Sequence, residues 1–468
     1  MGETPSPMRR LLGLWALIAS TTSLAAGPLP PEVVRAARLA SEATKRLTAD
    51  GGALWGRPVI APWLFVRGDQ MYSNYDAHTD ALTPIPTAAL PPGIPLWTAP
   101  LPPGLSASNT AVEWEEYRWA MVMLPLPAAD QDALRLLIHE AFHVWQPTVL
   151  RLDAFNETGP GSDLLDQPEG RIWLRLEMLA LQEALSAQTP DDATLARPLL
   201  FRARRLQAAT PQERERERLL ELAEGCAEYT GWSLSGGTRD DLIRALAEAP
   251  RNPTLVRSFP YATGPAYGEL LQHRDKSWRF RTAQVPDLAK LLALTLEPIS
   301  AAWAQAALEG SAARDAVDAR AQREGAAFKL EAVRKEEEKR WAGRQKQLAE
   351  LKARFVDGPT LRIRPAELRL TFDYRASIPL GDAGTVLAAV GWKTDAGADL
   401  NAPNGALVSP DWKEVRVPLE KGVKLPAGAL SAKGHWKGKA GWTLALPAGW
   451  VISAEGTSYA ASPPAEKK

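Results

Sequence analysis

The chain has 468 residues, 45% of them hydrophobic and 24% charged, which predicts a globular protein with room for two or three domains. Its 55 basic and 55 acidic residues give a formal net charge of zero, which argues against nonspecific binding of nucleic acids. The chain contains one cysteine, Cys226, so an intrachain disulfide framework is excluded.

The first 26 residues are typical of a secretory signal peptide. Arg9 and Arg10 precede an apolar run over residues 11–19, and small residues at 23–26 offer a cleavage site after Ala25 or Ala26. The apolar run is short for a membrane-spanning helix. We therefore expect an exported protein, periplasmic or secreted, with no transmembrane anchor after cleavage.

The part before residue 125 is expected to contribute a helix and a sheet. Residues 31–48 predict a helix, residues 62–67 a strand, and the proline-rich residues 84–103 an ordered surface loop. Residues 111–124 are rich in strand formers and lead into a turn at residues 125–127. The free edge of this last strand could hold an extended peptide.

Residues 128–146 predict a helix with an acidic first turn, which Pro147 is expected to end. Apolar side chains gather on one side of it at helical spacing, whereas a histidine pair and a glutamate fall on the other. The apolar set is Leu134, Leu137, Ile138, Ala141, Phe142 and Trp145.

Two of the five histidines of the chain, His139 and His143, are one helical turn apart, so both imidazoles can reach one ion. Glu140 lies between them, where its carboxylate can touch a water molecule at the ion. Two neutral nitrogen ligands, an open position and a carboxylate base are what a zinc hydrolase needs. The alternative is a solvent-facing histidine pair on an ordinary amphipathic helix.

A carboxylate is the natural third zinc ligand, because no further histidine follows closely. Thr210, Pro211 and Glu213 predict the capped start of a helix that runs into residues 219–232. On that helix Glu224 would bind zinc. Glu228, one turn later, could accept a hydrogen bond from the outer ring nitrogen of a liganding histidine.

Glu177 is the competing candidate for the third ligand. It lies in residues 168–185, which predict an amphipathic helix, and a carboxylate among apolar residues needs a partner. Glu177 could bind the metal, support a ligand from behind, or pair with a buried arginine such as Arg175.

Hydrolysis of an amide also needs a group that stabilises the developing oxyanion. Tyr261 and Tyr267 are candidate donors in residues 259–271, and we count Tyr267 among the candidate catalytic residues with Glu140. The alternative is ordinary packing of the two rings.

The C-terminal third changes pattern twice. Residues 311–358 are strongly charged and predict a solvated helical connector that could mediate oligomerisation. Residues 359–461 predict short strands separated by turns, consistent with a small β-sandwich-like domain. Residues 462–468 are expected to form a disordered tail.

The combination of His139-Glu140 and His143 with a downstream Glu224-Gly225 and Ala227-Glu228-Tyr229 resembles the gluzincin-type (MA-like) zinc metallopeptidases. The resemblance covers residues 110–235 and extends towards residue 300. It implies an α+β zincin-like metallopeptidase domain, residues 27–310, mostly helical after an N-terminal sheet, with Glu224 completing the zinc site. The gap of 81 residues (224 − 143) is longer than in the best-known gluzincins.

The sequence thus predicts an exported zinc-dependent metallopeptidase in which Glu140 is the general base and the substrate is a peptide or protein. One alternative is a catalytically silent zincin-like binding protein of the cell envelope. Another is a zinc hydrolase of non-peptide amide bonds.

Overall fold

The computed structural model describes residues 29–76, 79–86, 90, 93–102, 104–151, 162–368, 370–394 and 396–464. The expected signal peptide, and the part of the expected tail from 465 to 468, lie outside these ranges. The chain divides into two compact units. In described residues, the first contains those up to 151 together with 226–238, and the second contains 162–225 and 239–464.

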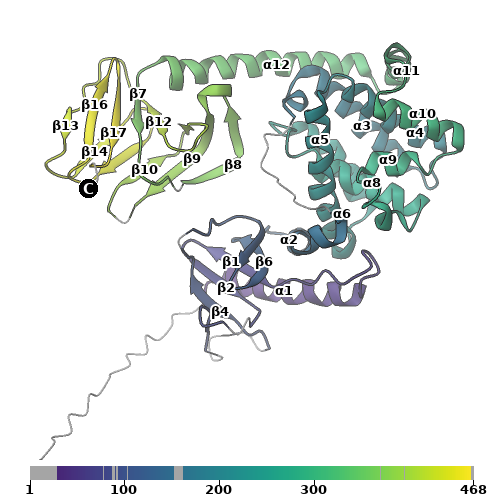
Figure 1. Cartoon of the computed structure of the whole chain (residues 1–468), viewed down its shortest axis with the longest axis horizontal. Helices are drawn as coiled ribbons and strands as arrows, with labels where there is room; N and C mark the ends of the chain where they lie inside the picture. The colour runs from purple at the N-terminus through teal and green to yellow at the C-terminus, as the bar shows by residue number, and fades with distance from the viewer. Residues whose placement is uncertain are drawn as a thin grey trace, which may run out of the picture. The chain divides into compact units, whose positions relative to one another are not determined.

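The first unit is a mixed sheet with three helices (Figure 1). Its strands lie in the order β3-β4-β2-β1-β6-β5, with β1 and β6 parallel and the other neighbours antiparallel. The elements are α1 (Pro31–Asp50), β1 (Trp63–Arg67), β2 (Gln70–Ser73), β3 (Thr83–Pro84), β4 (Trp97–Pro100), β5 (Thr110–Trp114), β6 (Tyr117–Met123), α2 (Asp130–Leu150) and α6 (Cys226–Ser235).

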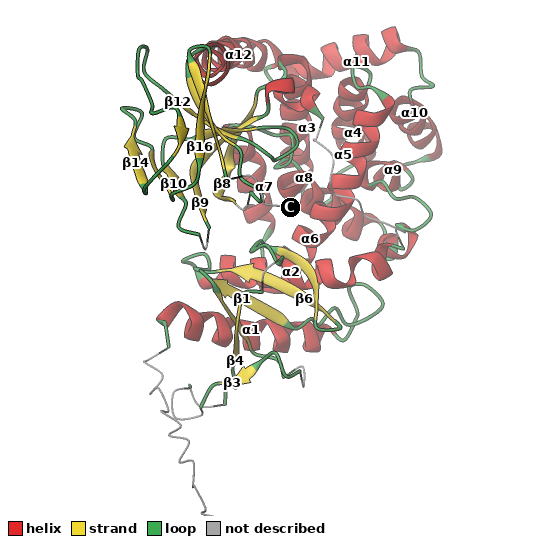
Figure 2. Cartoon of the chain, turned by 60° about the vertical axis from the view of Figure 1, so that its left-hand side comes forward, coloured by secondary structure: helices red, strands yellow, loops and turns green. Residues whose placement is uncertain are grey.

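Alternation along β1 gives this sheet two apolar faces. Leu64 and Val66 point to one face, where they pack with Met71 and Met121. Trp63 lies on the other face, and its indole N–H donates to the carbonyl of Leu137 in α2. Figure 2 shows the sheet in yellow beside α1 and α2 in red. The sheet therefore supports the helix that carries the histidine pair.

Residues 111–124 form a hairpin instead of one strand. Glu115 and Glu116, with φ of 47° and 64°, make the two-residue turn between β5 and β6. Because β6 pairs with β1 on one side and β5 on the other, its edge is not free. The two edge strands of the sheet are β5 and β3.

The prediction that Pro147 ends this helix is wrong, because Pro147 lies inside α2. The helix ends at Leu150, and Arg151, whose φ of 52° is left-handed, caps it. Proline removes one backbone hydrogen bond from a helix interior. Burial of Gln146 and of Leu150, on either side of Pro147, favours continuation of the helix.

Helices form most of the second unit before residue 358. The expected capping box is confirmed at the start of α5, where Thr210 and Glu213 each accept from the other's backbone N–H. The elements are η2 (Asp163–Asp166), α3 (Pro168–Ser186), α4 (Asp192–Leu206), α5 (Pro211–Leu220), η3 (Glu221–Gly225), α7 (Arg239–Glu248), η4 (Ala249–Arg251), α8 (Pro260–Arg274), η5 (Trp278–Arg281), α9 (Leu288–Ala293), α10 (Pro298–Glu309), α11 (Arg314–Ala327), α12 (Leu330–Lys352) and η6 (Ala353–Asp357).

The expected connector is two helices, α11 and α12, separated at Phe328 and Lys329. Helix α12 is not fully solvated, because Glu337 is only 2% exposed. Its carboxylate accepts from Arg171 at 3.0 Å and from Arg175 at 2.9 Å, both on α3. These contacts fasten α12 to α3.

In the described residues, the C-terminal strands form one continuous hydrogen-bonded sheet. Strand β9 joins its two halves: residues 385–387 pair with β11 and residues 390–393 with β10, with a bend at Ala389, where φ is 52°. The strands are β7 (Thr360–Ile363), β8 (Leu370–Pro379), β9 (Thr385–Lys393), β10 (Asp399–Ala402), β11 (Ala406–Val408), β12 (Val415–Pro418), β13 (Gly428–Ala429), β14 (Gly434–Lys437), β15 (Thr443–Leu446), β16 (Val451–Glu455) and β17 (Ser458–Ser462).

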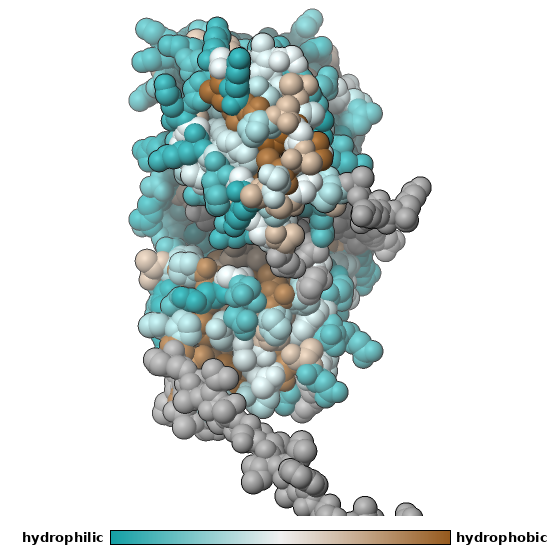
Figure 3. Space-filling model, turned by 90° about the vertical axis from the view of Figure 1, so that its left-hand side faces the viewer, coloured by the Kyte–Doolittle hydropathy of each residue, from teal (hydrophilic) through white to brown (hydrophobic). Residues whose placement is uncertain are grey.

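The core of this sheet is apolar, with Leu361, Val390 and Leu446 fully buried. Figure 3 shows one face of the molecule with apolar residues in brown scattered among hydrophilic residues in teal. The chain is therefore mixed α and β, with helices in the middle, an N-terminal sheet and a C-terminal sheet domain.

Candidate metal centre

His139 and His143 lie on the buried part of α2 and are 3% and 8% exposed. Their Nε2 atoms are 3.0 Å apart, with the rings nearly perpendicular. The helical repeat places both imidazoles on the same face, as the sequence predicted.

Acceptors contact the outer nitrogens of both rings. His139 Nδ1 is 2.9 Å from Glu228 Oε2, and His143 Nδ1 is 2.6 Å from Gln146 Oε1. Carboxylate and amide oxygens accept, so these contacts favour the tautomer in which each Nδ1 carries the proton and each Nε2 is free to bind a metal. Two lone pairs then face the same small region.

Glu228 was predicted for this role from the sequence, whereas Gln146 and Arg135 were not. Arg135 Nε lies 3.2 Å from the other oxygen of Glu228, so the carboxylate is held from both ends. Gln146 follows His143 by three residues, a helical spacing that could have identified it.

Glu224 completes a group of three. The candidate ligand atoms of His139, His143 and Glu224 all lie within 4.8 Å of one another, and all three residues are buried. Within the described residues this is the one such cluster of histidine, cysteine and acidic side chains. Cys226, two residues later, is buried and lies outside this group.

The group fits a zinc ion. Two nitrogen ligands at zinc distances of about 2.0–2.1 Å in tetrahedral geometry stand roughly 3.3 Å apart, close to the 3.0 Å separation of the two Nε2 atoms. Two imidazoles and one carboxylate are also a donor set that catalytic zinc sites use, with one position left open.

Glu224 lies in η3, a π-helical turn inserted between α5 and α6. Such turns are rare and are frequent at functional sites. The phenol of Tyr261, in the first turn of α8, donates to Glu224 Oε2 at 2.6 Å. Of the two candidate tyrosines, Tyr261 is therefore the one that touches the group.

Tyr267 and Glu177 contact each other instead. Tyr267 is fully buried and donates to Glu177 Oε1 at 3.0 Å. Burial raises the pKa of the Tyr267 phenol well above its usual value, although the charge of Arg202 opposes this. Glu177 also accepts from Arg202 at 2.7 Å and from Arg205 at 3.2 Å. It thus pairs with buried arginines, although Arg175 is not one of them.

Glu140 follows His139 directly on α2 and is 3% exposed. Successive helical residues are about 100° apart, so its carboxylate projects beside the histidines and not in line with them. This placement suits a group that acts next to the metal without binding it.

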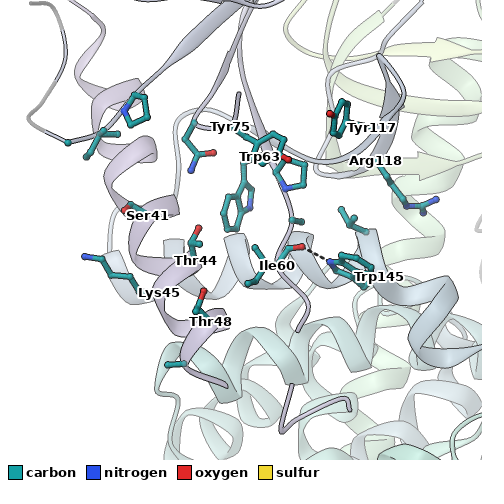
Figure 4. A pocket seen from close by; sticks show the side chains of 18 of the residues that line it. Ser41, Thr44, Lys45, Thr48, Ile60, Trp63, Tyr75, Tyr117, Arg118 and Trp145 are labelled. Atoms are coloured by element: carbon teal, nitrogen blue, oxygen red, sulfur yellow. Dashed lines mark hydrogen bonds between the residues drawn. The ribbon is translucent and has the colours of Figure 1, made fainter. Parts of the chain in front are cut away.

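The first unit also contains a cavity that is not this centre. It has a volume of about 1110 Å³ and is lined by α1 residues such as Thr44, by Tyr117, and by Trp145 and Thr148 of α2 (Figure 4). Trp145 and Thr148 are roughly 140° to 200° from His143 around the helix axis. The cavity therefore lies behind the face that carries the histidines.

Comparisons with known protein families, with curated proteins and with solved structures find no match. Over the described part of the chain, no helix has both the length and the apolarity needed to cross a membrane. A functional proposal therefore depends on the side chains of the metal centre themselves.

Proposed function

We propose that the protein is an exported zinc metallopeptidase of the gluzincin type, with His139, His143 and Glu224 as the zinc ligands. The observation that carries the proposal is the convergence of these three buried side chains. Its second support is the hydrogen bonding of both outer ring nitrogens, which leaves the inner nitrogens as donors to a metal.

A zinc ion held by His139, His143 and Glu224 would polarise the substrate carbonyl and lower the pKa of water. Glu140 takes the proton from the attacking water and returns it to the leaving amine nitrogen. Glu228 and Gln146 keep the two imidazoles in the tautomer and orientation that the metal requires. Of the two candidate tyrosines, Tyr261 is the one at the metal group, and its phenol would have to release Glu224 in order to donate to an oxyanion.

Strand β5 supports a peptide substrate over other amides. As an edge strand it has a neighbouring strand on one side only within the described residues, and an extended peptide could add along its other side as a further strand. This interaction uses the main chain, so it does not select a particular side chain.

Metal analysis followed by a peptide-library digest tests the proposal. The purified chain should contain one zinc per molecule and cleave peptides, and a chelator should abolish cleavage until zinc is added back. Bound zinc with no cleavage of any peptide or amide would favour a silent binding protein. Cleavage confined to non-peptide amides would favour the other hydrolase class, and absence of zinc binding would refute the site.

A further inference from the structure

Four buried glutamates follow one another along the helical stretch from α5 through η3 to α6. Glu217, Glu221, Glu224 and Glu228 are 5%, 3%, 7% and 9% exposed. Their contacts differ in kind: Glu217 and Glu221 pair with buried arginines, Glu224 belongs to the metal group, and Glu228 contacts a histidine. The change occurs inside η3, between Glu221 and Glu224.

Arg202 of α4 holds the first end of this turn. Its Nη1 and Nη2 atoms donate to the two oxygens of Glu221 at 2.5 and 2.6 Å, and its Nε donates to Glu177 at 2.7 Å. Arg202 is 6% exposed and Glu177 is fully buried. Burial alone would raise the pKa of Glu221, but the charge and hydrogen bonds of Arg202 lower it, so the carboxyl stays ionised.

Helix α8 holds the turn from a second direction. The hydroxyl of Thr263 donates to Glu221 Oε1 at 2.6 Å, and the phenol of Tyr261 donates to Glu224 Oε2 at 2.6 Å. Between these contacts the backbones nearly touch, because a Cβ added to Gly264 would lie 2.2 Å from the Cα atom of Gly225. Neither glycine could carry a side chain there.

The π-helical turn explains why Glu221 and Glu224 make different contacts. A π-turn holds more residues than an α-turn, so each residue rotates less about the axis. In a regular α-helix the two side chains, three residues apart, would share one face. The wider turn separates the two side chains around the helix axis. Glu221 therefore contacts Arg202, whereas Glu224 contributes to the metal group. A π-turn is unfavourable by itself, so it needs contacts that hold it.

We infer that Arg202 and Thr263 are positioning residues for the metal centre: by fixing Glu221 they hold the π-turn in the form that presents Glu224 to the metal. The inference rests on the proposed function, since it takes Glu224 as the third zinc ligand. Neither residue touches metal or substrate. Replacing either residue should therefore lower the affinity for zinc directly, and should affect the chemical step only through the bound metal.

Zinc affinity of the full chain tests this inference, using Arg202→Lys and Thr263→Val. Lysine keeps the positive charge but cannot make the two-pronged contact with Glu221. Valine keeps the shape of threonine but cannot donate. Arg171→Lys is the matched control, because Arg171 is fully buried and pairs with Glu337 on α12. Thr263→Ser restores the hydroxyl. Chelator competition gives the Kd, and thermal unfolding of the metal-free protein gives the Tm.

We expect Arg202→Lys and Thr263→Val to weaken zinc binding by about 10-fold or more, the usual effect of losing a group that supports a metal ligand. Thr263→Ser should recover most of the affinity. Arg171→Lys should lower the Tm without changing the Kd. Cobalt absorption in the visible range should change with Arg202→Lys and stay unchanged with Arg171→Lys, because it reports the ligand geometry.

Wild-type affinity in both Arg202→Lys and Thr263→Val would overturn the inference, and so would equal weakening by Arg171→Lys. If Arg202→Lys does not fold, the comparison of Thr263→Val with Thr263→Ser decides alone. Failure of the wild-type protein to bind zinc would instead refute the proposed function, so the two failures are distinguishable.

Discussion

At the scale of single residues, the candidate centre depends on hydrogen bonds made behind the histidines. The outer nitrogen of His139 is hydrogen-bonded to Glu228, and that of His143 to Gln146. Arg135 forms an ion pair with Glu228. The helical repeat alone predicted the histidine pair and the position of Glu140. Gln146 was missed because an amide has no metal-ligand signature of its own.

Replacing Glu140 by glutamine tests its role as base. Glu140→Gln should keep one zinc per chain and the wild-type Tm while lowering kcat by about 10²–10⁴-fold, the usual contribution of general acid–base catalysis. Metal analysis, thermal unfolding and peptide cleavage measure the three quantities. A rate near that of the wild type would exclude the mechanism, and loss of zinc would mean that Glu140 is structural.

The third ligand can be decided by a pair of variants. Glu224→Gln should lose stoichiometric zinc, because a neutral amide is a poor substitute for a carboxylate ligand. Glu177→Gln should retain one zinc but lower stability by about 3 kcal/mol, since it leaves Arg202 and Arg205 short of a buried counter-charge. Zinc content and chemical unfolding separate the two effects, and the opposite pattern would make Glu177 the ligand.

At the scale of elements, the sequence predicted where helices form better than it predicted the irregular turns and prolines inside them. The capping box at Thr210 marked the start of α5, but nothing local marks the π-turn at Glu221–Gly225, which exists because α4 and α8 hold it. Pro147 was misjudged for the same reason, since burial on both sides of it decides whether the helix continues. Tertiary contacts set these features, and one sequence does not reveal them.

The contact of α12 with α3 should make stability depend on pH. Burial would raise the pKa of Glu337, but Arg171 and the neighbouring arginines lower it below its usual value of 4.5. The folded protein then binds fewer protons than the unfolded chain. This contribution to stability is therefore present above about pH 4.5 and is lost as pH falls through the lower folded value.

Unfolding by denaturant at pH 7, 5, 4 and 3 checks this expectation with Glu337→Gln. The variant should be less stable than the wild type at pH 7, by about 3 kcal/mol, because Arg171 loses its buried counter-charge. The difference should shrink as pH falls below 4.5. A difference that stays constant from pH 7 to pH 3 would mean that Glu337 does not titrate with a lowered pKa.

At the scale of the whole molecule, the domain order was easier to predict than its boundaries. The change from helical to strand patterning near residue 358 was visible in the sequence, and the C-terminal sheet domain follows it. The discontinuous first unit was not visible, because residues 226–238 join it after a stretch that belongs to the second unit, residues 162–225 in the described part of the chain. No local pattern indicates that return.

Two truncations test where the helical part ends. A chain ending at residue 358 retains Glu337 and should fold and bind zinc. A chain ending at residue 310 lacks α11 and α12, leaves Arg171 buried without Glu337, and should unfold at a lower temperature or fail to fold. Circular dichroism and zinc content compare them. If the shorter chain is equally stable, α12 is dispensable.

The return of residues 226–238 to the first unit has a consequence during synthesis. Helix α6 packs so closely on α2 that a Cβ added to Gly231 would lie 2.5 Å from the carbonyl oxygen of Arg135. A ribosome adds about 5–20 residues per second, so the 85 residues from the end of α2 to the end of α6 (235 − 150) take roughly 4 to 17 s. Throughout that interval the nascent chain holds a histidine helix whose covering partner has not yet been made. A chaperone or an early-bound metal ion would have those seconds in which to act.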